Sequence, residues 1–458
     1  MEQALALHLS GHLHEAAHAY REALREAPDD APVLSNYGGL LCSLGKFEEA
    51  RAPLQRAVTI DPSFADGWCN LGNCFLKLQR YNDAIAAYRN CLRISPTDAR
   101  ALSNLGLALD YCGENALAQK FHQAAVRLDP DNVQTRMNNA VSLLSGGDYL
   151  NGFREYEWRW VPPESRNALM AQPQWTGKAV PGRTVLIHGD GGFGDMLQFV
   201  RFVPEVQRRC GRTIVRVKRD LLALLRRSFP DTLFVSEDEP VPAHDLQCPA
   251  MSLAYAVGAT LETLPHAAGY LRADAGKVAT WRERIALDAP PVAGQGRTPL
   301  RIGLVWAGAP HRDVPGVALA DQRRSTDLAS FAPLAEAVPD ALVYSLQIGE
   351  RAEQARTPPG GMRVIDHTAL LRDFDDTAAL VSALDVIVAV DTSTAHLAAG
   401  LGKPTLMLSR FDQCWRWLSR RADSPWYDTL RIYRQATPFD WSDPIRRVCA
   451  DLQKLAAH

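Results

Sequence analysis

Several features that would mark other protein classes are missing from this chain of 458 residues. No apolar run reaches the roughly 18 residues that a membrane span needs, and the N-terminal stretch lacks the basic region and cleavage site of a signal peptide. The 50 Lys and Arg residues do not exceed the 52 Asp and Glu residues, which argues against a non-specific nucleic-acid binder. The nine cysteines form no C-x-x-C pair, as expected of buried thiols in a reducing compartment. These absences predict a cytoplasmic protein with no integral membrane segment and no nucleic-acid partner.

Motifs of metal and acyl-enzyme chemistry are missing too. The sequence contains no H-E-x-x-H, no G-x-S-x-G and no G-x-x-x-x-G-K-[ST]. Asp373, Phe374 and Asp375 spell D-x-D, but this triplet opens a predicted helix and follows no strand. Acidic residues are favoured at a helix N-terminus by the helix dipole alone. We therefore expect no metal and no bound cofactor.

A 34-residue repeat organises the first third of the chain. Its columns are Pro28, Pro62, Pro96 and Pro130; Gly38, Gly72 and Gly106; and Ala16, Ala50, Ala84 and Ala118. Each unit predicts two amphipathic helices that end at the proline, with small residues where the paired helices approach closely. The pattern resembles the tetratricopeptide repeat and covers residues 1–162. The resemblance implies an α superhelix.

A polar column runs through the same repeats. It consists of Asn36, Asn70, Asn104 and Asn138, each on the first helix of its unit. An amide carries donors and an acceptor, so a row of amides along the concave groove is suited to hold an extended peptide. The alternative is that asparagine merely tolerates a half-buried helix position. Protein O-GlcNAc transferases carry a similar ladder, and this resemblance implies a protein or peptide partner.

After a connector at 163–182, packed around Trp175, the pattern changes to short apolar strands that alternate with helices. It predicts one Rossmann-like α/β lobe at 183–290 and a second at 300–458, joined by a linker at 288–299. Ligands of open parallel sheets bind beyond the carboxyl ends of the strands. Candidate site residues are therefore expected in the turns that follow the strands.

The turn after the first predicted strand is rich in glycine and leads to Asp195 at the start of a helix. A carboxylate there would repel phosphate, so it is suited to bind or activate a hydroxyl group; its alternative role is to cap the helix. In the second lobe, Asp391, Thr392, Ser393 and Thr394 follow a strand and open a helix, with His396 in its first turn. Exposed amides and hydroxyls at such a helix start favour a pyrophosphate. An ordinary capped helix with a structural histidine is the alternative.

Two arginine-containing segments are further candidates. Arg323 and Arg324 follow a Gly- and Pro-rich loop and are suited to pair with phosphate, although a solvated charge run is an equal alternative. Near the C-terminus, arginines alternate with Trp415, Trp417 and Trp426. This density is typical of a flap over a cleft or of core packing, and the sequence does not separate the two.

Taken together, GDGGFGDMLQFVRFVP, IGLVWAG with a later RRS, YSLQIG, VDTSTAHLAAGLGKP and the C-terminal WRW segment resemble the heptosyltransferase-like family nine of glycosyltransferases. The resemblance implies the GT-B fold, a nucleotide-sugar donor and inverting transfer without a metal. It makes Asp195 the general base and assigns Asp391, Thr392, Ser393, Thr394 and His396 to the donor diphosphate. The family's lysine near the diphosphate has no counterpart, and Arg323 or Arg324 takes its place beside Gly308. Asp190, Gly192, Gly194 and Gln198 form the loop on the acceptor side.

Three functions remain open at this point. The first is a glycosyltransferase whose repeats present a protein acceptor. The second is a glycosyltransferase that acts on glycolipid or polysaccharide, with the repeats serving assembly. The third is an interaction scaffold whose transferase lobes have lost catalysis.

Overall fold

The computed structural model describes residues 2–265, 269–288, 299–310, 315–412 and 414–457. The chain divides into two compact units, Met1–Pro162 and Pro163–His458. Within the described residues, no helix is both long and apolar enough to cross a membrane.

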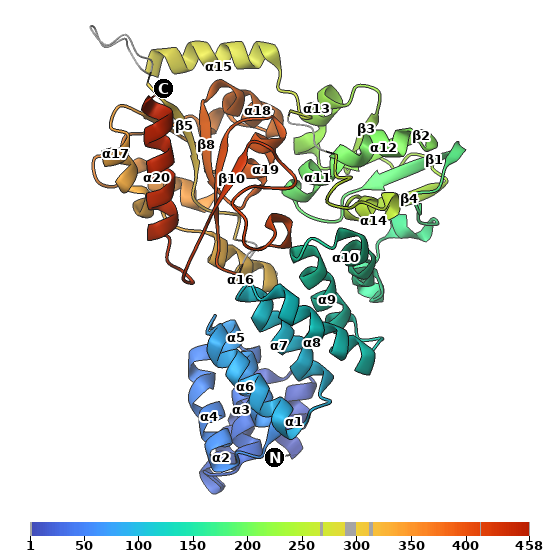
Figure 1. Cartoon of the computed structure of the whole chain (residues 1–458), viewed down its shortest axis with the longest axis vertical. Helices are drawn as coiled ribbons and strands as arrows, with labels where there is room; N and C mark the ends of the chain where they lie inside the picture. Colours follow the sequence, from blue (N-terminus) through green and yellow to red (C-terminus); the bar gives the residue numbers. More distant parts are fainter. Residues whose placement is uncertain (1, 266–268, 289–298, 311–314, 413, 458) are drawn as a thin grey trace. The chain divides into compact units, whose positions relative to one another are not determined.

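The first unit is a series of antiparallel helix pairs (Figure 1). Its helices are α1 Glu2–Leu9, α2 Leu13–Glu26, α3 Ala31–Ser43, α4 Phe47–Ile60, α5 Ala65–Lys77, α6 Tyr81–Ile94, α7 Ala99–Tyr111, α8 Asn115–Leu128, α9 Val133–Ser145 and α10 Tyr149–Tyr156, followed by the 3₁₀ turn η1 Glu157–Trp160. The first helices of successive repeats, α3, α5, α7 and α9, pack on one another. Each repeat-column proline follows the end of a second helix, as predicted.

The glycine column marks the closest approach of paired helices, which confirms the reason given for it. A methyl group placed on Gly72 of α5 would lie 2.6 Å from the ring of Tyr88 on α6, and one on Gly106 would lie 2.7 Å from His122. The alanines of the phased column, Ala16, Ala50, Ala84 and Ala118, have no exposed surface. The array thus packs helix on helix through positions where no larger side chain fits.

The second unit begins with a four-stranded parallel sheet in the order β3-β2-β1-β4. Its strands are β1 Val180–His188, β2 Cys210–Val217, β3 Leu233–Ser236 and β4 Leu246–Pro249. The helices around it are α11 Phe193–Phe199, α12 Val203–Gln207, α13 Arg219–Ser228 and α14 Leu253–Val257, with the 3₁₀ turns η4 Val200–Phe202 and η5 Ala250–Ser252. We call this sheet and its helices the first lobe.

The connector that was expected to reach residue 182 is shorter than predicted. Val180 already pairs with Cys210, and a register shift separates it from the regular ladder that starts at Thr184. The proline and glycine at 181 and 182 fall within this irregularity, so the residues there are typical of a loop although they form the start of β1. Trp175 is buried, and its indole donates to the carbonyl of Lys178 at 2.9 Å.

The second lobe is built on a six-stranded parallel sheet in the order β10-β9-β8-β5-β6-β7. Its strands are β5 Arg301–Val305, β6 Leu342–Ser345, β7 Val364–Asp366, β8 Val386–Val390, β9 Thr405–Ser409 and β10 Leu430–Arg434. Its helices are α16 Pro315–Arg324, α17 Pro333–Ala337, α18 Phe374–Ala383, α19 Ser393–Gly400 and α20 Ser442–Ala457, with α15 Ala275–Asp288 preceding the sheet. The predicted linker at 288–299 lies, apart from its two end residues, outside the described residues. The α/β region of parallel sheets agrees with the expectation from the sequence, to which the structure adds β10.

Buried charge connects helices of the two lobes around α18. Asp375, 2% exposed, pairs with Arg227 of α13 and lies 2.8 Å from the Nζ of Lys277 on α15. Asp373 caps α18 by accepting from the amides of Asp375 and Asp376. The D-x-D triplet therefore opens a helix, as expected, and its second carboxylate is an ion-pair partner of basic residues.

We predict that Gly72→Ala destabilises the first unit by about 1–3 kcal/mol, because the added methyl group overpacks against the buried Tyr88 ring. Chemical denaturation of the full chain measures this loss. Gly39→Ala is the matched control: its nearest atom would be the side-chain nitrogen of Asn70 at 3.9 Å. That variant should be neutral or more stable by up to about 1 kcal/mol. Equal effects of the two substitutions would contradict the packing argument.

Candidate functional site

The glycine-rich turn of the first lobe is held by two aspartates. β1 ends at His188, and α11 begins beyond the turn, at Phe193. The Oδ2 of Asp195 accepts the amide of Gly192 at 2.7 Å, which fastens the start of α11. The Oδ1 of Asp190 accepts the amide of Met251 at 3.0 Å and so ties the turn to η5. The capping role considered for Asp195 is thus present in the structure.

The second oxygen of Asp195 is bound by an arginine of the other lobe. Arg416 lies on the 3₁₀ turn η9 Trp415–Trp417; its Nη2 donates to Asp195 Oδ1, and its Nε donates to Gln198 Oε1 at 2.9 Å. The Asp195 side chain keeps 25% of its surface exposed, whereas Gln198 is fully buried. The WRW triplet stands out in the sequence. The pair of Arg416 with Asp195 does not, because nothing in the local pattern indicates a partner so far away along the chain.

The start of α19 lies at the end of β8 and is half-buried at Asp391, Thr392, Ser393 and Thr394. Thr392 is the N-cap residue, but its hydroxyl donates to the carbonyl of Val390 at 3.2 Å and caps no amide. The first turn of α19 therefore lacks a cap from its N-cap side chain. A helix start with uncapped amides is suited to accept an anion.

His396, one turn further, is a packing residue in this structure. It is 5% exposed, its Nδ1 lies 2.8 Å from the hydroxyl of Tyr427, and its ring stacks on Trp417 with centroids 5.2 Å apart. Burial lowers the pKa of His396 to about 4. The imidazole is therefore neutral near neutral pH, and it is enclosed where the sequence predicted a group that reaches a phosphate.

Helices α11 and α19 contact each other through Gly194. A methyl group placed on this glycine would lie 2.9 Å from the His396 ring and 3.5 Å from the Cα of Ser393. The missing side chain lets the two turns meet. The residues expected on the acceptor side and those expected at the donor phosphates are thus neighbours.

Arg201, which the sequence did not single out, lies behind this contact. It is 5% exposed and donates to the carbonyls of Gln198 at 2.8 Å and Trp426 at 2.5 Å, and to the hydroxyl of Tyr270 at 3.1 Å. Its guanidinium lies 4.6 Å from the ring centroid of Tyr427. A buried cation needs such partners, since an unpaired one would be costly. Trp415, Trp417 and Trp426 are buried as well, so the aromatic segment is core packing.

The predicted phosphate-binding arginines already have carboxylate partners. Arg323 donates to Asp412 at 2.7 Å, and Arg324 donates to Asp321 at 3.1 Å; both aspartates are nearly fully buried. The amide of Gly308 donates to Ser325 at 3.0 Å, and a side chain at Gly308 would collide with Asp321 and Arg324. Residues 311–314 of this loop lie outside the described residues. Phosphate binding by these arginines stays a prediction.

The segments that carry Asp195, Gly308 and Asp391 all follow strands at the switch point of their sheet. In the first sheet, β1 separates β2 from β4, so the chain changes direction across the sheet at the strand that leads to Asp195. In the second sheet, the change lies between β5, which leads to Gly308, and β8, which leads to Asp391. Open α/β sheets bind ligands at such switch points.

The asparagine column links successive repeats. The side-chain nitrogens of Asn70 and Asn138 donate to Ser35 and Ser103 of the preceding repeat, each at 3.0 Å, and that of Asn104 donates to Asn73 at 2.9 Å. Asn36, the first of the column, is half-buried and Asn138 is buried. One N–H of each of these three amides therefore holds neighbouring repeats together. The asparagines are thus more than residues that a half-buried helix position tolerates, which was the alternative considered from the sequence.

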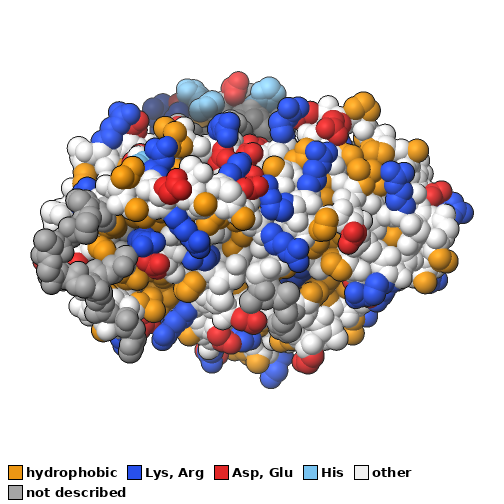
Figure 2. All heavy atoms as spheres, turned by 90° about the horizontal axis from the view of Figure 1, so that it is seen from above, with side chains coloured by type: hydrophobic (Ala, Val, Ile, Leu, Met, Phe, Trp, Pro, Cys, Tyr) orange, Lys and Arg blue, Asp and Glu red, His pale blue; other side chains and the backbone are white. Residues whose placement is uncertain are grey.

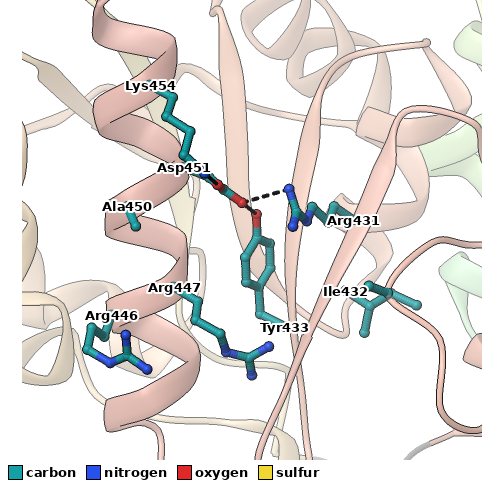
Figure 3. Close-up of a pocket in the computed structure, with 9 residues that line it drawn as sticks. Arg431, Ile432, Tyr433, Arg446, Arg447, Ala450, Asp451 and Lys454 are labelled. Atoms are coloured by element: carbon teal, nitrogen blue, oxygen red, sulfur yellow. Dashed lines mark hydrogen bonds and ion pairs between the residues drawn. The ribbon is translucent and has the colours of Figure 1, made fainter.

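A pocket of about 240 Å³ lies elsewhere on the second lobe, between β10 and α20 (Figure 3). Asp451 accepts from the Tyr433 hydroxyl at 2.6 Å and lies 2.9 Å from Arg431 and 2.8 Å from Lys454. Arg446 and Arg447 pair with Asp443. The cations of this pocket are compensated by neighbouring carboxylates, and on the face drawn in Figure 2 basic and acidic side chains are likewise interspersed.

Family comparisons identify the repeats. Residues 65–98 and 99–132 match the tetratricopeptide repeat, and residues 38–79 match a TPR repeat family. The helical unit contains tetratricopeptide repeats. The chain is similar to protein FlbA of Caulobacter vibrioides, with 24% identity over 345 residues that cover 69% of this chain. It spans about half (54%) of the length of that relative.

Several solved structures are similar to part of the chain. One is YrrB, described as a TPR protein with an unusual peptide-binding site, at 24% identity and a TM-score of 0.29, covering 32% of this chain and 76% of YrrB. Another is TTC0263, a thermophilic TPR protein of Thermus thermophilus, at 21% identity and a TM-score of 0.33, covering 36% and 90% of the two chains. A third is MamA, at 20% identity and a TM-score of 0.32, covering 36% and 96%.

We predict that the buried neutral state of His396 makes stability fall as pH decreases. Its folded-state pKa of about 4 lies below the ordinary value of 6.5, so between these values the unfolded chain binds more protons. From pH 7 to pH 5 this difference costs about 2 kcal/mol. Urea unfolding at both pH values measures it. His396→Gln, which cannot titrate, should flatten the dependence by that amount; an unchanged slope would contradict the assignment.

We predict that Arg416→Gln lowers the free energy of unfolding by about 1–3 kcal/mol, because the oxygens of Asp195 and buried Gln198 lose a charged donor. A double-mutant cycle with Asp195→Asn isolates the pair, and the coupling should exceed about 0.5 kcal/mol. Arg219→Gln is the control, because Arg219 pairs with exposed Asp238 and its loss should stay within about 0.5 kcal/mol. Additive effects of the Arg416 and Asp195 substitutions would refute the coupling.

Proposed function

We propose that the second unit is a metal-independent, inverting glycosyltransferase of the GT-B type, which moves a sugar from a nucleotide-sugar donor to an acceptor hydroxyl. The observation that carries the proposal is the contact between two turns, each of which follows a strand at the switch point of its sheet. Asp195 after β1 and the uncapped start of α19 after β8 come together where Gly194 contacts His396 and Ser393. A transfer reaction needs one group for the acceptor and one for the leaving diphosphate in such proximity.

In this proposal the donor diphosphate binds at the start of α19. The amides at the helix start and the hydroxyls of Ser393 and Thr394 donate to the phosphate oxygens, and the helix dipole favours the anion. His396 supports this turn from behind as a neutral, buried ring, so it positions the turn and makes no contact with phosphate. Arg323 and Arg324 contribute to the leaving group only by exchanging Asp412 and Asp321 for phosphate.

Asp195 takes the proton of the acceptor hydroxyl as this oxygen attacks the anomeric carbon. The C–O bond to the diphosphate breaks in the same step, so the configuration inverts. Both carboxylate oxygens of Asp195 already accept one hydrogen bond, from Gly192 and Arg416. Each retains acceptor capacity, and the side chain remains partly exposed. The pair with Arg416 fixes the orientation of the carboxylate.

The tetratricopeptide repeats present the acceptor in this proposal, which makes a protein or peptide the partner. The stacked first helices α3, α5, α7 and α9 carry the asparagine column. One donor of Asn70, Asn104 and Asn138 is used within the array. Asn70 and Asn104 are half-buried, and the remaining amide N–H of each is the group offered to a peptide carbonyl.

A second candidate function is a scaffold without catalysis. It is favoured by the internal partners of the proposed catalytic charges: Arg416 for Asp195, Asp412 for Arg323 and Asp321 for Arg324. In this arrangement the charges are balanced within the protein itself. Donor binding distinguishes the two candidates, because a scaffold has no use for a nucleotide sugar.

The test is a thermal-shift screen of the full chain against nucleotides and nucleotide sugars. We expect one donor to raise the midpoint; a ligand at 100 times its Kd adds about 2.7 kcal/mol. Asp195→Asn should leave this shift in place but slow acceptor-dependent release of nucleotide by about 10²–10⁴-fold. Asp238→Asn, an exposed carboxylate of the same lobe, is the control. If no nucleotide sugar shifts the midpoint, the scaffold is the better description.

A further inference from the structure

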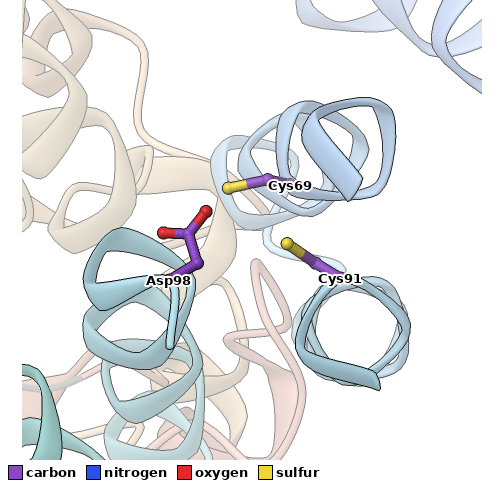
Figure 4. A group of neighbouring side chains, drawn as sticks. All are labelled: Cys69, Cys91 and Asp98. Atoms are coloured by element: carbon purple, nitrogen blue, oxygen red, sulfur yellow. The ribbon is translucent and has the colours of Figure 1, made fainter. Parts of the chain in front are cut away.

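Two thiols and a carboxylate converge in the helical unit. Cys69 lies on α5, Cys91 on α6, and Asp98 is the N-cap residue of α7. One ligand atom of each lies within 4.8 Å of the others, and Figure 4 shows the sulfurs and the carboxylate facing the space between the three helices. Cys69 is 4% exposed, Cys91 is fully buried, and the Asp98 side chain is 14% exposed. No spacing motif in the sequence reveals the group, because its members are too far apart along the chain.

Asp98 performs its structural role with one oxygen. Its Oδ1 accepts the amides of Arg100 and Ala101 at 2.9 and 3.0 Å, which caps α7. Its Oδ2 lies 3.6 Å from the nearest guanidinium nitrogen of Arg100, a long ion-pair distance. A carboxylate with one oxygen used for capping can give the other to a second partner.

Packing does not require cysteine at these positions. The array repeats the same junction on both sides, one repeat earlier with Ser35, Ala57 and Phe64, and one repeat later with Ser103, Ala125 and Asn132. Serine and alanine fill the two helix positions there, in the same fold. The combination of two thiols and a carboxylate occurs at the middle junction alone among the three.

The asparagine column also bypasses Cys69. At the neighbouring junctions the serine at the equivalent position accepts the amide of the next repeat, Ser35 from Asn70 and Ser103 from Asn138. At the middle junction Asn104 donates instead to Asn73 at 2.9 Å. The sulfur of Cys69 is therefore left out of the ladder that occupies its counterparts.

We propose that Cys69, Cys91 and Asp98 bind a thiophilic divalent cation of the zinc type, which ties the α5/α6 pair to the start of α7. Two thiolates, one carboxylate and a water molecule complete a tetrahedral site. Zinc–sulfur and zinc–oxygen bonds of about 2.3 and 2.0–2.2 Å require ligand atoms about 3.3–3.8 Å apart, which small side-chain rotations reach from the observed group. The loaded site carries one net negative charge, and Arg100 lies next to it.

Loading the site displaces two thiol protons. Affinity must then rise with pH, because the cation competes with protons for the sulfurs. The bound cation connects α5, α6 and α7, which belong to two successive repeats.

The experiment uses the full chain, purified with reductant, stripped with a chelator and titrated with Co²⁺. We expect one equivalent to bind with a thiolate-to-cobalt charge-transfer band, and Zn²⁺ to displace it. Cys69→Ser and Cys91→Ala should abolish the band; both introduce residues that the array itself uses at the equivalent positions, so the fold is preserved. Asp98→Asn keeps the cap as Asn132 does at its junction and should weaken binding at least about tenfold.

Cys74→Ala is the matched control, since Ala108 takes its place one repeat later. Cys74 has a neighbouring thiol, Cys42, but the described residues offer that pair no third ligand. The band should survive this substitution. The proposal is overturned if the reduced wild-type chain binds no Co²⁺, if the band disappears with Cys74→Ala in place of Cys91→Ala, or if thiol titration finds Cys69 and Cys91 joined in a disulfide that reductant opens without creating a cation site.

Discussion

The contact between α11 and α19 is the constraint on which the proposed site depends. Two helices that start at different sheets can approach this closely at their N-termini only if one of them carries no side chain at the contact, and Gly194 of α11 satisfies this condition against the His396 ring of α19. Around it, a carboxylate of one lobe binds an arginine of the other, and Arg201 fills the space behind with bonds to both lobes. The relative position of α11 and α19 is thus fixed by buried polar groups that have few alternative partners.

This construction also explains which parts of the molecule could be predicted from the sequence. Strands such as Val386–Val390 are short apolar runs that end at a glycine or a polar turn, and local patterning is sufficient to find them. The repeat was equally accessible, because packing of equivalent pairs imposes the same small residue every 34 positions. β10 is harder to predict because its arginines and tyrosine are typical of a surface or flap segment, whereas Leu430, Ile432 and Tyr433 are buried in it.

The partners of charged side chains could not be predicted. Arg323 and Arg324 end α16 and Arg416 lies between two buried tryptophans, and each binds a carboxylate whose position depends on the complete fold. The same holds for Cys69, Cys91 and Asp98, which three helices bring together. Hydrophobic periodicity encodes which face of an element is buried but carries no information on which polar group lies opposite.

The change of partner at Asn104 has a structural consequence. In a repeat array, the free energy of folding is approximately a sum of one term for each repeat and one for each interface between neighbouring repeats. The contacts at each interface therefore matter individually. At two interfaces the asparagine donates to a serine of the preceding repeat: Asn70 to Ser35, and Asn138 to Ser103. At the interface between them, Asn104 donates to Asn73, whose side-chain oxygen also accepts from the Tyr88 hydroxyl. The link at the middle interface therefore runs through Asn73 and joins three helices, α5, α6 and α7, whereas each neighbouring link joins only two. The array is built from equivalent repeats, but they are not fastened to one another in equivalent ways.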